Sequence, residues 1–153
     1  MVKKLFRKHI PATYQVGLML ARSHRVLKEY TDDVLRPYNI TSVDWAILGL
    51  LHDAKPSAQR LMDLSEALGV EPPFTTKRIE RLVQLELVKV LTGTADKRER
   101  FASITPAGIT LITTVEPLLK TASRTWLQGT SPLEVYGFIK VITAICSRKN
   151  DNQ

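Results

Sequence analysis

The chain contains a single cysteine, Cys146, among its 153 residues, so no disulfide can form within it. A lone thiol fits a reducing compartment, and we therefore expect a cytoplasmic protein. No apolar run approaches the roughly 20 residues that a membrane span needs. The basic N-terminal segment is followed by a short apolar stretch that polar residues interrupt. We expect neither a cleaved signal peptide nor contact with a membrane.

Residues for catalysis or metal binding are also scarce. The three histidines, His9, His24 and His52, stand at no metal-ligand spacing, and the cysteine is not near them. The sequence has no glycine-rich phosphate loop, and no nucleophile stands beside a base and an orienting acid. We therefore expect no metal, no cofactor and no enzymatic activity. A catalytic set assembled only in space is the alternative.

What remains is the composition of an ordinary soluble globular protein, with 44% hydrophobic and 24% charged residues. The length suits one domain, or one domain with an attached dimerisation layer. The net charge is +7, and the excess lies mainly in the first 30 residues. A basic arm of Lys3, Lys4, Arg7 and Lys8 can add contacts to phosphates, although solvated basic tails are common.

Helical periodicity covers the first part of the chain. A candidate helix runs from about Pro11 to Leu35, and Pro37 ends it. Thr41 and Asp44 then form a capping box, in which each side chain accepts a hydrogen bond from the other residue's backbone amide. The box opens a short helix whose inward residues are Trp45, Leu48 and Leu51 or His52.

Two further helices follow closely on each other. The first covers residues 60–69 and ends at Gly69, with Leu61, Leu64 and Leu68 inward. Shortly afterwards Pro72 and Pro73 open the second, because prolines are tolerated where helix amides lack intrahelical partners. A short helix, a tight turn and a second helix are the signature of a helix-turn-helix.

The second of these helices has two different faces. Its inward side comprises Ile79, Leu82 and Val83, with Thr75 and Thr76 one turn earlier. At 100° per residue, the outer side comprises Phe74, Lys77, Arg81 and Gln84, with Arg78 on the flank. Cations one turn apart can reach a guanine edge or adjacent phosphates. Alone, such a face is equally a solvated helix surface.

A predicted hairpin follows directly and strengthens the nucleic-acid interpretation. Residues 88–91 favour a strand, Gly93 allows a turn, and residues 100–104 return with alternating character. The tip carries Asp96, Lys97 and Arg98. We expect Asp96 to hold the guanidinium of Arg98 by a charge-assisted contact, leaving a neighbouring cation free for the minor groove.

Two helices complete the chain. Thr105 caps a long helix that runs to about Gln128, whose apolar stripe is Leu111, Val115, Leu118, Ala122 and Trp126 and which Pro117 is expected to kink. Gly129 ends it, and a capping box of Ser131 and Glu134 opens the last helix. An apolar stripe there suggests a dimer interface, comprising Val135, Phe138, Ile139, Ile142 and Ile145.

These residues together resemble the MarR family, the multiple-antibiotic-resistance type of transcription regulator. The resemblance covers roughly residues 11–147, and its carriers are Ile40-Thr41, Trp45-x-x-Leu48, Leu64-Ser65-x-x-Leu68-Gly69-Val70, Arg81-Leu82, Leu87-Val88, Asp96-Lys97-Arg98 and Ile104-Thr105-Pro106-Ala107-Gly108. It implies a mainly α fold with a small β-wing. A winged helix-turn-helix lobe would occupy about residues 41–105. Residues 10–38 and 106–147 would form dimerisation helices of the same single unit.

The resemblance also implies a function. A homodimer would read successive major grooves of a pseudo-palindromic double-stranded DNA operator, as a regulator and more specifically a repressor. Lys77 occupies the site of the family's groove Arg, and Arg98, together with Lys97, that of the wing cation. The DNA-contacting set comprises Phe74, Thr76, Lys77, Arg78, Arg81 and Gln84 on the helix, and Asp96, Lys97 and Arg98 on the wing.

The sequence departs from the family's pattern in three places. Leu85-Glu86 stands where the family often has Lys-Gly, so a different turn is expected after the recognition helix. Pro72-Pro73 and Phe74 replace small polar residues, which weighs against base contacts in the first turn. Lys77 in place of Arg loses bidentate recognition of guanine, so specificity is expected to depend more on DNA shape.

Control of DNA binding has several candidate routes. The family often binds small anionic or aromatic effectors, for which His24, Arg25, Tyr38 and Trp45 are candidate contacts, with Trp45 equally explicable as core. Some members sense oxidants through a thiol near the first helix, whereas Cys146 lies on the last apolar stripe and is expected to be a buried, inert hydrophobe. The alternatives to a DNA-reading regulator are a thiol-based sensor and a ligand-binding or protein-interaction module that no longer reads DNA.

Overall fold

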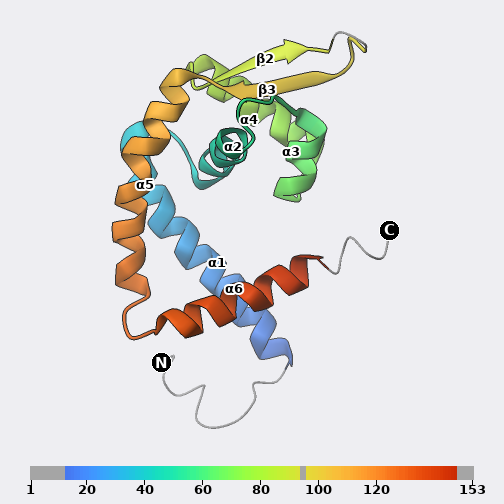
Figure 1. Cartoon of the computed structure of the whole chain (residues 1–153). Coiled ribbons are helices and arrows are strands. Elements are labelled where there is room, and N and C mark those ends of the chain that lie inside the picture. Colours follow the sequence, from blue (N-terminus) through green and yellow to red (C-terminus); the bar gives the residue numbers. More distant parts are fainter. Residues whose placement is uncertain (1–12, 94–95, 148–153) are drawn as a thin grey trace. The chain divides into compact units, whose positions relative to one another are not determined.

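The computed structural model describes residues 13–93 and 96–147. Figure 1 shows a mainly helical chain with a small β-hairpin. The elements follow in the order α1 (Thr13–Leu35), η2 (Arg36–Tyr38), α2 (Ser42–Asp53), β1 (Gln59–Arg60), α3 (Leu61–Leu68), α4 (Pro72–Gln84), β2 (Val88–Thr92), β3 (Arg100–Ile104), α5 (Pro106–Trp126) and α6 (Pro132–Ser147). The predicted mainly α fold with a β-wing is confirmed. The predicted basic arm, residues 3–8, lies outside the described residues.

The chain divides into two compact units, residues 1–119 and residues 120–153. In the first unit, α2, α3, α4 and the sheet enclose an apolar core with the end of α1 and the first half of α5. Its buried residues are Leu35, Ile40, Ile47, Leu48, Leu51, Leu61, Leu64, Ile79, Leu82, Val88, Ala102, Ile104 and Val115. Within the described residues, none of the helices has the length and apolar character to cross a membrane.

The start of α2 is held by two carboxylates. The predicted capping box is present, since the Thr41 amide donates to Asp44 Oδ2 at 2.9 Å and the Asp44 amide donates to Thr41 Oγ1 at 3.4 Å. In addition, the Ser42 amide donates to Asp32 Oδ1 of α1 at 2.6 Å. Partial burial raises the pKa of Asp32, but hydrogen bonds from Lys28 and Ser42 outweigh that effect and hold it below its ordinary value. Asp32 therefore ties α1 to the first helix of the lobe.

The sheet has three antiparallel strands in the order β1-β3-β2. The hairpin of β2 and β3 was expected, and Val88 pairs with Ile104 at its base. Strand β1 was not predicted. Arg60 was assigned to the following helix, but its backbone is extended and it pairs with Phe101 of β3. A strand of two residues is too short to produce an alternating pattern, so the sequence carried no signal for it.

The turn after α4 has a left-handed residue, although no glycine is present. Glu86 has φ 59°. Its amide donates to Val83 O at 2.9 Å, and the Leu87 amide donates to Leu82 O at 3.0 Å. These two bonds are those of a Schellman helix end, whose left-handed residue is usually glycine. Glu86 thus adopts the left-handed conformation that glycine usually supplies at this position.

The start of α5 packs closely against this turn. Thr105 is the predicted N-cap: its hydroxyl donates to Glu86 O at 2.7 Å and accepts from the Gly108 amide at 3.1 Å. A Cβ placed on Gly108 would lie 2.4 Å from Leu87 O and 2.7 Å from Ile104 Cγ1. Glycine is therefore required here by the close approach of α5 to the turn that precedes the wing.

The second unit contains the end of α5 and α6. Gly129 has φ 82°, and the predicted capping box forms, with the Ser131 amide donating to Glu134 Oε2 at 2.7 Å. That hydrogen bond lowers the pKa of Glu134. Of the predicted interface residues, Val135 and Ile142 are half-buried, and Phe138, Ile139 and Ile145 are exposed.

The expectation that Cys146 is a buried thiol is wrong for the single chain. The residue is exposed, because α6 presents its apolar stripe to solvent and no residue of α6 is buried. The stripe of α5 is likewise only partly covered: Val115 is fully buried, whereas Leu118 and Trp126 are exposed. An apolar stripe identifies the side of a helix that avoids water, but it does not say whether the same chain covers it.

Candidate nucleic-acid interface

The outer face of α4 carries basic, acidic, amide and aromatic side chains. It borders a hollow of about 620 Å³ that is lined by Phe74, Lys77, Arg78, Glu80, Arg81 and Gln84. On the inner side, Thr75, Ile79 and Leu82 are buried as expected. Val83 is 39% exposed, contrary to its assignment to the inner side.

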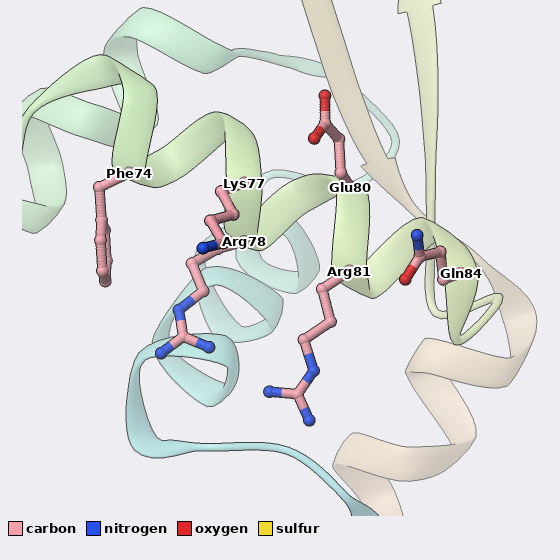
Figure 2. A pocket seen from close by; sticks show the side chains of 6 residues that line it. All are labelled: Phe74, Lys77, Arg78, Glu80, Arg81 and Gln84. Carbon is pink, nitrogen blue, oxygen red and sulfur yellow. The ribbon is translucent and has the colours of Figure 1, made fainter.

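The two arginines of α4 are bound within the chain. Arg81 Nη2 donates to Asn39 O at 2.6 Å and to Asn39 Oδ1 at 3.0 Å, and its Nη1 lies 3.4 Å from Asp44 Oδ2. Arg78 Nη1 lies 3.6 Å from Asp44 Oδ1. Figure 2 shows both side chains on the same side of the helix. Arg81 was expected to project outward from the lobe, but it points back to the loop before α2.

Asp44 is the centre of this arrangement. Its carboxylate is fully buried, it closes the capping box of α2, and it faces both guanidinium groups. Asn39 contributes through a left-handed backbone, with φ 56°, that presents its carbonyl and side-chain oxygens to Arg81. The start of α2 is therefore linked to the middle of α4 by charge-assisted contacts.

The remaining side chains on the outer face of α4 differ in their exposure and in their contacts within the chain. Lys77 and Gln84 are exposed, and Lys77 makes no ion pair within the part of the chain that the structure describes. Thr76 is half-buried and its hydroxyl donates to Pro72 O at 3.1 Å. Phe74 is 40% exposed, and the Arg78 guanidinium lies 5.3 Å from its ring centroid. Lys77 is thus the cation of α4 that can meet a ligand without first leaving an internal partner.

The contact that Asp96 makes at the wing tip differs from the predicted one. Asp96 Oδ1 accepts a hydrogen bond from the backbone amide of Arg98 at 2.8 Å, whereas a contact with the guanidinium was expected. A short side chain such as Asp reaches the backbone two residues ahead more easily than a flexible guanidinium. Lys97 and Arg98 are exposed.

Two ion pairs connect β3 to its neighbours. Arg60 of β1 pairs with Glu99 just before β3, and Arg100 Nη1 lies 3.8 Å from Glu80 Oε1 of α4. Glu80 points away from the two arginines of α4 (Figure 2). These contacts were absent from the sequence prediction, as were the partners of Asp44. The capping box identified Asp44 as important, but nothing in the spacing indicated which distant arginines reach it.

The candidate effector residues come from three consecutive elements, α1, η2 and α2. His24 and Arg25 are exposed on α1, and Tyr38 and Trp45 are half-buried and pack against the core. Trp45 packs against the core, which agrees with its interpretation as a core residue. A ligand site among these four residues stays a prediction.

The arrangement defines a class of protein. Helix α3, the turn at Gly69 and helix α4 form a helix-turn-helix, and the hairpin of β2 and β3 follows it as a wing. Helix α4 has the position of a recognition helix, with the wing beside it. The first unit therefore contains a winged helix-turn-helix.

Part of the chain matches a known family of proteins. The sequence model of the MarR family matches residues 40–99, which span α2 to the wing tip. The winged helix-turn-helix of this chain is therefore similar to that of the MarR family.

Solved structures agree with this assignment. AbsC, a MarR family transcriptional regulator from Streptomyces coelicolor, is 21% identical with a TM-score of 0.78, over 95% of this chain and 100% of its own. Bordetella bronchiseptica BpsR, whose DNA binding is regulated by 6-hydroxynicotinic acid, is 23% identical with a TM-score of 0.77, over 86% and 98%. MepR of S. aureus, solved in complex with DNA, is 19% identical with a TM-score of 0.73, over 90% and 98%. At these identities the likeness establishes the fold.

Proposed function

We propose that the protein is a sequence-specific DNA-binding transcription regulator, acting as a repressor that binds a pseudo-palindromic operator as a homodimer in the cytoplasm. The observation that carries the proposal is the outer face of α4, where Lys77 and Gln84 are exposed, together with the exposed Lys97 and Arg98 at the tip of the wing that follows α4. A helix of this kind enters the major groove, and a cationic wing reaches the backbone or the minor groove. The MepR complex with DNA supports the same use of the fold.

The contacts divide into two kinds by their chemistry. Gln84 can bond bidentately to adenine, and Lys77 can reach the acceptor atoms of guanine or a phosphate. Lys97 and Arg98 supply positive charge at the wing, where a narrow minor groove has an enhanced negative potential. Arg78 and Arg81 position α4 through Asp44 and contribute to affinity indirectly. Thr76 faces its own helix backbone and is a less direct contact.

Dimer formation is supported by the apolar side chains that each unit exposes. Tyr14, Leu18 and Tyr30 of α1 are exposed in the first unit, and Leu133, Phe138, Ile139 and Ile145 of α6 are exposed in the second. Apolar surface of this extent on terminal helices is typical of an interface. A second copy of the chain would cover it and place two recognition helices on one operator.

We further propose control by a small anionic or aromatic effector. BpsR, whose DNA binding is regulated by 6-hydroxynicotinic acid, provides the precedent within this fold. His24, Arg25, Tyr38 and Trp45 are the candidate contacts. A ligand that prefers a spacing of the two lobes that misfits the operator lowers DNA affinity by its differential binding free energy.

The proposal is tested by selecting bound duplexes from a random DNA pool and measuring their affinity in gel shifts at several salt concentrations. Affinity is expected to fall steeply with salt, as it does whenever phosphates are neutralised. Lys77→Ala and Arg98→Ala are each expected to cost about 1–3 kcal/mol where they read bases. Lys55→Ala, in an exposed turn between α2 and β1, is the matched control. Losses within about twofold for both variants would contradict the assigned contacts.

A protein that selects no duplex would instead be a ligand-binding or protein-interaction module. The selection experiment separates the two functions directly, because a module of that kind gives no enrichment at any salt concentration. Release from DNA by mild peroxide, abolished in Cys146→Ser, would identify a thiol-based regulator.

A further inference from the structure

We infer that Phe74 is a specificity-determining residue that selects a thymine by contact with its C5-methyl group in the major groove. The inference rests on the proposed function and names one base feature that the α4 face recognises. Nothing in the pattern of charges on α4 requires an aromatic residue there. Its exposure on the first turn of a recognition helix therefore needs a physical explanation.

Phe74 is presented to solvent by its own helix. It is the third residue of α4, after Pro72 and Pro73, and its amide donates to Glu71 O at 3.0 Å. The ring is 40% exposed and borders the same hollow as Lys77 and Gln84. Figure 2 shows the ring projecting from α4 on the side that carries Arg78 and Arg81. N-terminal residues of a recognition helix are the ones that contact base edges.

The ring is held in place by a series of three groups. The guanidinium of Arg78 lies 5.3 Å from the ring centroid, over its face. The same guanidinium lies 3.6 Å from Asp44 Oδ1, whose carboxylate is fully buried. Asp44 is fixed in turn by hydrogen bonds from Thr41. A buried carboxylate thus anchors a cation, and the cation fixes an aromatic ring that would otherwise be a freely rotating surface group.

This arrangement leaves the ring, and not the arginine, to meet a base. Arg78 lies 3.6 Å from the buried Asp44 carboxylate, and moving it to DNA would take away one of the two cations that face that charge, which is costly. The ring offers an apolar surface that cannot donate or accept a conventional hydrogen bond. In the major groove the complementary apolar group of a natural base pair is the C5-methyl group of thymine, and Phe is among the side chains that contact it. A ring held before binding loses little conformational entropy on contact.

The test removes that methyl group alone. The full-length protein first selects duplexes from a random pool, and each thymine of the best duplex is then replaced by deoxyuridine, at symmetric positions in pairs. Wild-type protein is expected to lose about fourfold in affinity per half-site at one position, which is the contribution of about 0.8 kcal/mol for one buried methyl group. Phe74→Ala is expected to bind the thymine and deoxyuridine duplexes equally. Replacing that base pair by C·G, with and without 5-methylcytosine, tests whether the methyl group itself is read.

Val83→Ala provides the matched control. Val83 is a similarly exposed apolar residue of α4, nine positions from Phe74 and therefore on the opposite side of the helix. This variant is expected to keep the full difference between thymine and deoxyuridine. Selective, salt-dependent binding in which no thymine is sensitive, or in which Phe74→Ala keeps the same sensitivity, overturns the inference while the proposed function stands. Failure to select any duplex overturns both.

Discussion

Substitution of Asp44 tests the contact network that supports α4. Asp44→Asn keeps the shape of the side chain but removes the charge that faces two guanidinium groups at 3.4 and 3.6 Å. The carboxylate is fully buried, whereas the side chains of Arg78 and Arg81 are 24% and 34% exposed. The variant therefore removes the buried partner and leaves two cations that can turn partly towards water.

The magnitude follows from this asymmetry. Breaking a buried ion pair typically costs about 3–5 kcal/mol when the remaining charge stays buried. Here the remaining charges are partly solvated, so we expect Asp44→Asn to lower the free energy of unfolding by about 2 kcal/mol. Asp44→Ala also removes the capping box with Thr41 and should cost about 1 kcal/mol more. For a chain of this length, 2 kcal/mol corresponds to a fall in Tm of about 4–8 °C.

Urea unfolding at neutral pH, followed by the fluorescence of the neighbouring Trp45 and by circular dichroism, measures these changes. Asp53→Asn is the matched control, because Asp53 ends the same helix with its side chain 87% exposed, and it should change stability by less than about 0.5 kcal/mol. Arg81→Gln, alone and with Asp44→Asn, completes a double-mutant cycle that should show coupling of about 1 kcal/mol. Equal stability of the Asp44→Asn and Asp53→Asn proteins, or strict additivity in the cycle, would refute the reasoning.

Two further predictions concern the junction of α4, the wing and α5. Gly108→Ala should lose about 2–3 kcal/mol in urea unfolding, because the added Cβ meets Leu87 O at 2.4 Å; Gly49→Ala, with open space around it, should gain slightly, and equal midpoints would contradict the close approach. Glu86→Gly should gain about 0.5–1 kcal/mol by relieving the left-handed backbone at φ 59°, whereas Glu86→Ala should not. A glycine variant no more stable than the alanine variant would show that the turn stores no such strain.

The helices, their caps and the wing were predictable because each depends on local rules. The capping boxes at Thr41 and Ser131 lie within four residues of sequence, and both formed as expected. Contacts between distant residues were not predictable in the same way. Arg81 was correctly placed opposite the buried face of α4, yet its partners lie 37 and 42 residues away. Periodicity identifies the side of a helix but not which atoms a long side chain can reach.

The same limit explains the errors on the wing and on α6. Asp96 was identified as a residue that organises the tip. Its carboxylate accepts a hydrogen bond from the backbone amide of Arg98 and not from the guanidinium, because the geometry of the turn sets the partner. Cys146 was assigned to an apolar stripe correctly, and its exposure follows from the absence of a covering element in the described chain. In each case the residue was recognisable from its chemistry, and the partner was set by the tertiary structure.

Two of the α4 cations, Arg78 and Arg81, face the buried Asp44, whereas Lys77 is exposed. If Arg78 and Arg81 moved to DNA phosphates, they would leave the fully buried Asp44 carboxylate without its cations, and that cost would offset much of the gain. The arginines are therefore more favourable as internal supports. In the proposed function, nonspecific attraction to DNA then depends on exposed cations such as Lys77 and those of the wing tip. If Phe74 selects a thymine as inferred, that selection depends on a ring that Asp44 holds through Arg78, so we expect a substitution at Asp44 to reduce discrimination between operators more than it reduces attraction to DNA in general.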